Sequence, residues 1–306
     1  MNVRVSLIKN GGNRYINLLF KKERSARIIM ENQKIDVAYA LRMERDSKTS
    51  AGLYDWSQVQ FSFNSNHMEG STLTLGQTEQ IYHNREFIAD KDQRIRRDDQ
   101  IETENHFKLF NYMLDTINHP LTLEYIKKLQ GILKKGTSDE ENPLKVVGDF
   151  KRINNIINNT RLGDTQTSRA ADVPRDLKAL IERWEQTDHL KMKDFADFHY
   201  AFENIHPFSD GNGRVGRILL FKERCRNSLM PFIIRDENRA FYIRGLKQYK
   251  NDPEYLLGTF GQSLDEYTDA VQQVYGNDFE LLPKAKVKSN QFEQSNLINK
   301  KNIHKR

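Results

Sequence analysis

Apolar residues recur at steps of three and four along most of this chain, and this helical spacing limits what it can fold into. One stripe contains Phe195, Phe198, Phe202 and Ile205. Side chains three or four positions apart share one face of an α-helix, so each stripe predicts a helix with a buried face. Similar stripes predict further helices over residues 105–114, 121–133 and 177–184.

Strand-like patterns are confined to one part of the chain. Residues 153–157 are rich in isoleucine, and residues 161–164 supply turn-forming types. We therefore expect one small hairpin around residues 153–173. Thr74 and Gln77 have the spacing of a capping box, which predicts another helix start. Together these patterns predict an all-α, mainly helical fold with one small β-hairpin flap.

The positive charge of the chain lies at its C-terminal end. Seven basic residues and one acidic residue lie between Lys284 and Arg306, and this segment alone accounts for the formal charge of +6. A neutral body argues against a nucleic-acid partner, which needs a broad basic face. The chain after Pro283 has few apolar residues, so we expect it to be disordered.

Cysteine content and hydropathy indicate a soluble protein of a reducing compartment. Cys225 is the single cysteine in the sequence, which excludes a disulfide framework. No apolar run approaches the roughly 18 residues that a membrane span needs. The apolar run at residues 18–20 is too short for the core of a signal peptide. We therefore expect a cytoplasmic protein with no membrane partner.

The segment 206–217 has the composition of an anion-binding site. Pro207 is expected to end a helix, because the residue before a proline avoids the α region. The glycines in 211–213 tolerate positive φ and let a ligand approach the backbone closely. A second helix is predicted to begin near Arg214, and a helix N-terminus presents free N–H groups to an anion.

Charged residues around this loop indicate phosphate chemistry. Arg214 and Arg217 are expected in the first helical turn, where each cation opposes the helix dipole by roughly 0.3–1 kcal/mol. That arrangement is reasonable where phosphate groups are bound, since arginine matches their geometry. Asp210 could hold Mg²⁺, and His206 can accept a proton near neutral pH. These parts predict phosphoryl or nucleotidyl transfer.

Residues 206–217 also match a known motif. They resemble the Fic family signature His-Pro-Phe-x-(Asp/Glu)-Gly-Asn-Gly-Arg-x-x-Arg at every fixed position. Residues 148–152 resemble a second element of that family, although Lys151 leaves the register of its arginine open. The resemblance implies a Fic (Fido) catalytic core over 119–268. An N-terminal helical region over 1–118 and a C-terminal segment over 269–306 would flank it.

The resemblance implies transfer of AMP from ATP to a Ser, Thr or Tyr hydroxyl of a target protein, with release of pyrophosphate. It assigns the general base to His206, the Mg²⁺ ligand to Asp210 and an inward-packed anchor to Phe208. It assigns nucleotide binding to Gly211, Asn212, Gly213, Arg214, Arg217 and Tyr242. Partners would be ATP, an unidentified target protein and the enzyme itself, with a homo-oligomer left open.

A second signal lies upstream, at Ser65, Glu69 and Gly70. Ser65 and Glu69 are four residues apart and share a helix face, and Gly70 is suited to end that helix. An acid at a helix C-terminus is unfavourable and would gain from a cation, although a solvated helix end is the simpler interpretation. The pattern resembles the inhibitory Ser-x-x-x-Glu-Gly motif of Fic proteins. This implies a regulatory helix at about 57–70, in which Glu69 pairs with Arg217.

Several alternative functions compete with this interpretation. His199, Glu203 and His206 share a helix face, but their apolar surroundings and spacing argue against a metal hydrolase. The sequence also contains no phosphate-loop NTPase motif. A de-AMPylase or bifunctional enzyme that uses Glu69, a kinase, and a non-catalytic nucleotide-binding scaffold stay open. The sequence does not determine the target, the oligomeric state, the physiological trigger or the role of the basic tail.

Overall fold

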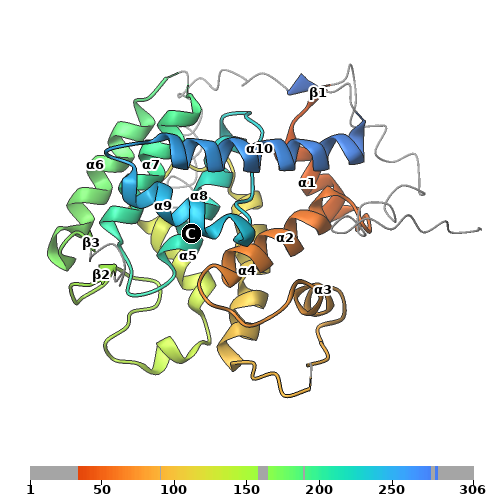
Figure 1. Cartoon of the computed structure of the whole chain (residues 1–306), viewed down its shortest axis with the longest axis horizontal. Coiled ribbons are helices and arrows are strands. Elements are labelled where there is room, and N and C mark those ends of the chain that lie inside the picture. Colours follow the sequence, from red (N-terminus) through yellow and green to blue (C-terminus); the bar gives the residue numbers. More distant parts are fainter. Residues whose placement is uncertain (1–33, 90, 158–164, 189, 277–279, 282–306) are drawn as a thin grey trace, which may run out of the picture.

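The computed structural model of the chain describes residues 34–89, 91–157, 165–188, 190–276 and 280–281, which form a mainly helical fold (Figure 1). This confirms the predicted fold class. Short 3₁₀ turns are η3 (Ser138–Glu141), η4 (Ala170–Asp172) and η5 (Asp236–Asn238). The α-helices are α1 (Val37–Asp46), α2 (Leu53–His67), α3 (Leu75–Asn84), α4 (Arg97–Asp115), α5 (Leu123–Lys134), α6 (Val173–Glu185), α7 (Met192–Ile205), α8 (Asn212–Arg226), α9 (Arg239–Gln248) and α10 (Glu254–Tyr275).

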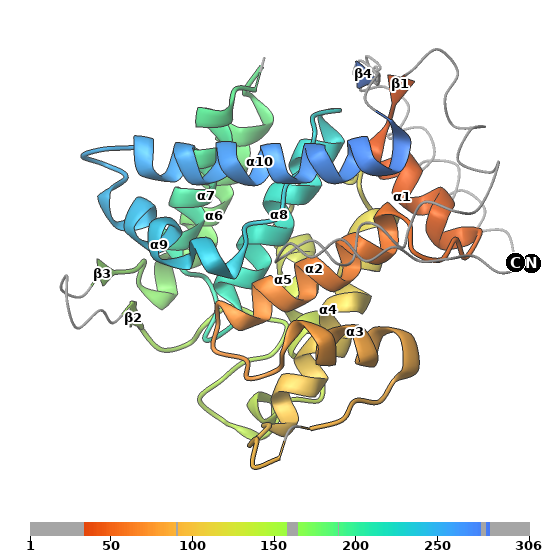
Figure 2. The same cartoon turned by 45° about the vertical axis from the view of Figure 1, so that its right-hand side comes forward.

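Helix α8 lies at the centre of this arrangement (Figure 2). It packs against α2, α4, α5 and α7, and all of its residues except Gly213 and Arg226 are buried. A helix that is covered on all sides is held by its neighbours rather than by its own helix propensity. The N-terminus of α8, where the predicted anion site lies, is therefore fixed in space by four surrounding helices.

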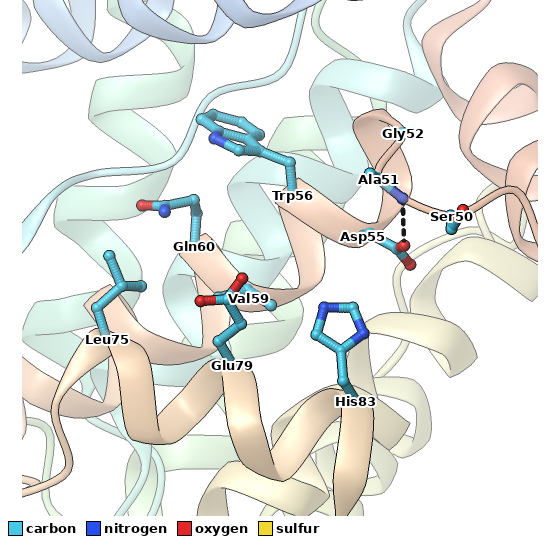
Figure 3. Close-up of a pocket in the computed structure, with 10 residues that line it drawn as sticks. All are labelled: Ser50, Ala51, Gly52, Asp55, Trp56, Val59, Gln60, Leu75, Glu79 and His83. Atoms are coloured by element: carbon cyan, nitrogen blue, oxygen red, sulfur yellow. Dashed lines mark hydrogen bonds between the residues drawn. The ribbon is translucent and has the colours of Figure 1, made fainter. Parts of the chain in front are cut away.

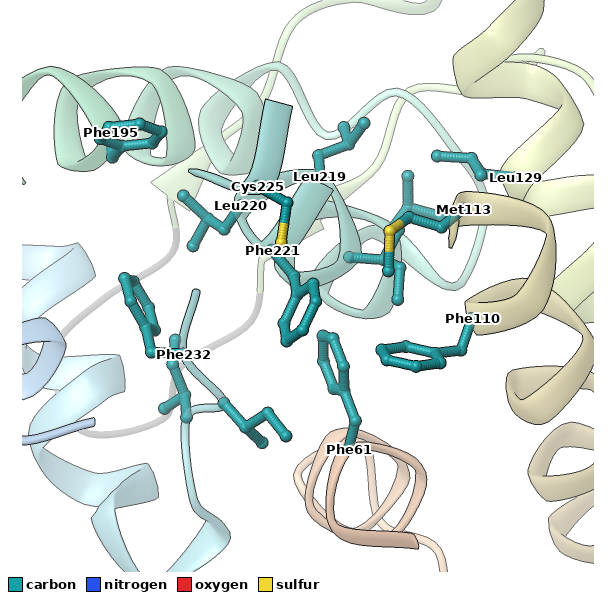
Figure 4. Packing of buried hydrophobic residues seen from close by; sticks show 14 of the residues in the cluster. Phe61, Phe110, Met113, Leu129, Phe195, Leu219, Leu220, Phe221, Cys225 and Phe232 are labelled. Carbon is teal, nitrogen blue, oxygen red and sulfur yellow. The ribbon is translucent and has the colours of Figure 1, made fainter. Parts of the chain in front are cut away.

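Aromatic rings join the N-terminal helices to α8 (Figure 4). The ring of Phe61 on α2 lies 5.6 Å from that of Phe221 on α8, and Phe110 on α4 lies 5.3 Å from Phe221. Ring centroids at these separations interact favourably beyond the area they bury. One buried apolar cluster contains all three rings and continues into α7 and α10. The N-terminal helices and the motif helices thus share one hydrophobic core.

Two very short strand pairs accompany the helices. Strand β2 (Ile156–Ile157) pairs antiparallel with β3 (Thr165–Gln166), within the range predicted for a hairpin. The predicted turn at 161–164 lies outside the described residues. The pair ends at Gln166, before the predicted residue 173, because η4 begins at Ala170 and α6 at Val173. A second pair, β1 (Lys34–Ile35) parallel to β4 (Glu280–Leu281), was not predicted. Two residues per strand are too few to give an alternating pattern.

The predicted helices are present, although their boundaries differ by a few residues or more. The stripe at 177–184 lies in α6, and the stripe at 121–133 matches α5, after which Gly136 adopts a φ of +76°. The Thr74–Gln77 capping box is confirmed. Helix α4 starts before the predicted 105–114. Its first turns are polar, so the apolar stripe did not reveal them.

Helices α1 and α10 were not predicted, and α10 runs across the boundary expected at residue 268. Residues 1–33 lie outside the described residues. So does the chain after residue 283, for which disorder was expected. Within the described part of the chain, no helix combines the length and apolar character that a membrane span requires.

Candidate active site

The motif loop connects α7 to α8. Helix α7 ends at Ile205, and His206 adopts left-handed backbone angles, with φ 50° and ψ 63°. Gly211, with a φ of +85°, precedes α8, which begins at Asn212 rather than near Arg214 as expected. Arg217 therefore lies beyond the first turn, and the predicted conflict with the helix dipole applies to Arg214 alone.

The side chain of Asn212 closes this loop. Its Oδ1 accepts a hydrogen bond from the backbone N–H of Phe208 at 2.8 Å, and its Nδ2 donates to the Phe208 carbonyl at 2.9 Å. The Phe208 ring is fully buried against Phe150, which confirms the expected inward anchor. Because the Asn212 side chain is bonded to the Phe208 backbone, Asn212 can contact an anion only through its backbone N–H.

His206 is held in the form that can accept a proton. Its Nδ1 lies 3.3 Å from the carbonyl oxygen of Glu203. A carbonyl only accepts hydrogen bonds, so Nδ1 carries the proton and Nε2 keeps its lone pair. Burial and the nearby charge of Lys151 lower the pKa of His206 to about 4. The imidazole is therefore neutral at physiological pH.

Asp210 lies among cations at the edge of the loop. Its Oδ1 accepts from the backbone N–H of Gly211 at 2.7 Å, and its Oδ2 accepts from Lys134 Nζ at 2.5 Å. Burial alone would raise the pKa of Asp210, but the charges of Arg214 and Lys134 hold it below its ordinary value. Arg214 is only 2% exposed and contacts Glu102, so it lies behind Asp210 and not on the open surface.

The Asp210 carboxylate fits the Mg²⁺ expected from the sequence. Its side chain is 36% exposed and ionised, and Mg²⁺ commonly takes one or two carboxylates together with phosphate oxygens and water. Within the described residues, no group of three or more His, Cys, Asp and Glu side chains is placed to hold a metal by itself. The metal expectation therefore depends on Asp210 together with nucleotide phosphates.

Arg217 reaches back to the end of α2. Its Nε donates to Ser65 Oγ at 3.0 Å and its Nη2 to the Ser65 carbonyl at 2.9 Å. The same Nη2 forms an ion pair with Glu69 Oε1 at 2.7 Å. Helix α2 ends at His67, three residues before the expected end, and Gly70 follows with a φ of +89°. The structure thus brings together Ser65, Glu69 and Arg217, as the sequence predicted.

The carboxylate of Glu69 lies against the glycine backbone that begins α8. A Cβ placed on Gly213 would overlap with Glu69 Oε1 and Arg217 Nη1. Burial alone would raise the pKa of Glu69, but the charges of Arg217 and Arg214 outweigh it and lower the pKa. An ionised carboxylate therefore occupies the space beside a helix N-terminus, where a phosphate would bind.

Tyr242 is placed differently from the expectation. It is 1% exposed, its hydroxyl lies 2.6 Å from His199 Nε2, and its ring lies 6.0 Å below the guanidinium of Arg217. A direct nucleotide contact does not fit this position, because Arg217 covers the ring. Tyr242 instead supports Arg217 from behind. His199 Nε2 also lies 3.9 Å from Glu203 Oε1, but the contact with Tyr242 occupies the nitrogen that a metal would need.

Two positioning residues escaped the sequence analysis. Lys151 is buried, and its backbone N–H donates to the Pro207 carbonyl at 2.9 Å while its Nζ donates to Thr167 beside β3 at 2.8 Å. Because Arg152 is exposed, Lys151 takes the inward position of the 148–152 element. Gln130 on α5 donates to the Asp210 carbonyl at 3.2 Å. Its position in a helix gives no sequence signal for this role.

The close approach of α7 and α8 depends on Gly216. A Cβ at this position would lie 2.6 Å from Glu203 Oε1 and 3.0 Å from His199 Cε1, both in the core. Gly216→Ala should therefore lower the free energy of unfolding by about 1–3 kcal/mol, the usual cost of overpacking. Urea unfolding measures this. Gly258→Ala on α10, where a Cβ meets nothing within 4 Å, is the matched control. Equal stability of the two variants would contradict the prediction.

A separate groove lies between α2 and α3 (Figure 3). It has a volume of about 300 Å³ and is lined by apolar and polar side chains, among them Trp56, Val59 and Glu79. None of the predicted site residues lines it. The chemistry expected from the sequence therefore lies at the motif loop and not at this groove.

The fold and the loop together define a helical protein with a candidate anion site beside a neutral histidine. Residues 120–222, about a third of the chain, match the family model described as Fic/DOC family. The chain is 27% identical over 197 residues to the "Protein adenylyltransferase Fic" of Drosophila erecta and 28% identical to that of Drosophila mojavensis. Each match covers 61% of this chain and 36% of the relative, so the chain matches about a third of their length.

Solved structures share the fold. A Fic-domain-containing signaling protein from Bacteroides thetaiotaomicron superposes with a TM-score of 0.64 at 21% identity. That match covers 79% of this chain and 98% of the other. Fic-1 from C. elegans superposes with a TM-score of 0.56 at 21% identity and covers 77% and 72% of the two chains. At these identities the likeness concerns the fold alone.

Proposed function

We propose that this protein transfers AMP from ATP to a Ser, Thr or Tyr hydroxyl of a target protein and releases pyrophosphate. The observation that carries the proposal is the neutral His206 next to the N-terminus of α8, with Arg217 on the following turn. The names of the curated relatives support the same group transfer. A cytoplasmic location and the enzyme itself as a target stay predictions from the sequence.

The proposed reaction assigns a role to each part of the loop. The target hydroxyl oxygen attacks the α-phosphorus of ATP, the bond from that phosphorus to the bridging oxygen breaks, and pyrophosphate leaves. Nε2 of His206 accepts the hydroxyl proton. The backbone N–H groups that begin α8 and the guanidinium of Arg217 hold the phosphates. Asp210 would hold Mg²⁺, which neutralises phosphate charge when bound.

We further propose that Glu69 keeps this site inactive at rest. Arg217 cannot hold a terminal phosphate while its Nη2 is bound to Glu69 at 2.7 Å. The Glu69 carboxylate also lies over Gly213, where a phosphate would need space. ATP that enters would therefore be misaligned for attack at its α-phosphorus, and small misplacements cost large factors in rate.

Labelled ATP tests the reaction class. The protein, as wild type and as Glu69→Gly, is incubated with ATP labelled at either the α- or the γ-phosphate, together with a cell lysate. Label on protein from the α-position supports AMP transfer, and label from the γ-position alone would make it a kinase. No label in any preparation would favour a nucleotide-binding scaffold. Release of AMP from labelled target by wild type, but not by Glu69→Gly, would identify a de-AMPylase or bifunctional enzyme.

The rate of AMP transfer should depend little on pH between about 6 and 8, because His206 is already a free base in this range. Its pKa is lowered to about 4 by burial and by Lys151, whereas an ordinary histidine titrates near 6.5. The measurement is kcat/KM against pH for Glu69→Gly, in which the Glu69 carboxylate is absent. A tenfold fall from pH 7.5 to 5.5 would contradict a lowered pKa of the base.

A further inference from the structure

Lys134 is the last residue of α5, and three carboxylates converge on its ammonium group. Nζ contacts Glu102 from α4, Asp139 from η3 at 2.8 Å and Asp210 from the motif loop at 2.5 Å. An ammonium has three N–H donors, so these three carboxylates can use all of them. The Lys134 side chain is 3% exposed. Lys134 therefore neutralises carboxylates from three separate elements at one point.

The three carboxylates differ in their surroundings. Glu102 and Asp139 are 11% and 7% exposed, and each has a second cation, Arg214 for Glu102 and Lys145 for Asp139. Asp210 is 36% exposed and faces the site, and its second cation, Arg214, lies farther away, at 3.4 Å. If Asp210 turned away, Lys134 would keep two carboxylate partners and stay neutralised. The contact with Asp210 is thus the one that Lys134 can lose at the lowest cost.

We propose that Lys134 is a built-in competitor of Mg²⁺ at Asp210. This inference rests on the proposed function, in which Asp210 binds the metal of the ATP complex. Without nucleotide, the ammonium of Lys134, together with the more distant Arg214, balances the Asp210 charge, and Lys134 keeps divalent cations out. A divalent cation that brings its own phosphate ligands displaces the single charge of Lys134. In the resting protein Lys134 then takes the place of the metal at Asp210, and Glu69 takes the place of a phosphate at Arg217.

Binding of Mn²⁺ to the nucleotide-free protein tests this role. Lys134→Met removes the charge but keeps an unbranched side chain, and it leaves three carboxylates facing one another. Its affinity for Mn²⁺, measured by calorimetry or by the electron paramagnetic resonance signal of free Mn²⁺, should exceed that of wild type by at least about tenfold. Asp210→Asn in the same background should abolish most of the gain. Equal affinities in wild type and Lys134→Met would overturn the proposal.

Lys145→Met is the matched control. Lys145 lies 2.6 Å from Asp139 but does not contact Asp210, so its loss should leave Mn²⁺ affinity unchanged. A destabilised Lys134→Met is still informative, because Mn²⁺ should raise its melting temperature more than that of wild type, and an equal rise would count against the proposal. No ATP or target is present in these measurements. Their outcome is therefore independent of whether AMP transfer itself is found.

Discussion

Replacing His206 with alanine should lower the rate of AMP transfer at least about a hundredfold, the typical contribution of a general base, and leave ATP affinity nearly unchanged. In the proposed reaction the imidazole acts on the proton of the target hydroxyl, whereas the phosphates contact the start of α8. The measurements are the transfer rate from α-labelled ATP and the ATP dissociation constant. Both are made in the Glu69→Gly background, where the contact between Glu69 and Arg217 is absent.

The backbone at His206 requires a second variant. Its φ of 50° is tolerated by asparagine better than by alanine, so His206→Asn removes the base with less strain. Both variants should be equally inactive if the imidazole is the base. His83→Ala, at an exposed position on α3, is the matched control and should transfer AMP normally. A transfer rate near that of wild type in His206→Asn would refute the assigned mechanism.

Glu69→Gly should raise the rate of AMP transfer, including self-modification, by at least about tenfold, which corresponds to roughly 1.4 kcal/mol of barrier. The substitution frees Nη2 of Arg217 and clears the space over Gly213. The fold should survive, because Glu69 lies beyond the end of α2 and its side chain is 33% exposed. The measurement compares transfer from α-labelled ATP at equal protein concentration, with melting temperatures recorded for both proteins.

Arg217→Ala provides the control for this prediction. If Glu69 inhibits through Arg217, then Glu69→Gly should change little in the Arg217→Ala background. A large additional gain there would show that Glu69 acts by another route, such as the space over Gly213. Equal or lower rates in Glu69→Gly alone, with unchanged thermal stability, would exclude autoinhibition and leave the transferase proposal standing.

The sequence predicted those parts of the site that lie in one continuous segment. Residues 206–217 carry their own turn and helix signals, so the loop between two helices could be inferred from Pro207, the glycines and the apolar stripe of α8. The pairing of Glu69 with Arg217 spans 148 residues, and the residues alone favoured a solvated helix end for Glu69. The prediction of the pair came from the family resemblance.

The contacts that the sequence did not reveal join residues that are far apart in the chain and meet only in the folded protein. Lys134 and Gln130 look like ordinary residues of an amphipathic helix, and their contacts with Asp210 arise only when α5 packs beside α8. The direction of Tyr242 likewise follows from the packing of α9 and not from its own neighbours. The early start of α8 was missed because Gly211, which initiates the helix, also resembles a loop residue.

The aromatic contacts of α2 restrict how the proposed block at Arg217 can be relieved. Phe61 is buried between Phe110 and Phe221, and truncation of a buried phenylalanine commonly costs about 3–5 kcal/mol. Cutting away α2 would therefore unfold the enzyme rather than activate it. The segment after Glu69 is also anchored, since Arg96 donates to the Gly70 carbonyl at 2.8 Å. Release of the proposed block would then need only the rotation of the Glu69 carboxylate away from Arg217, with α2 remaining in place.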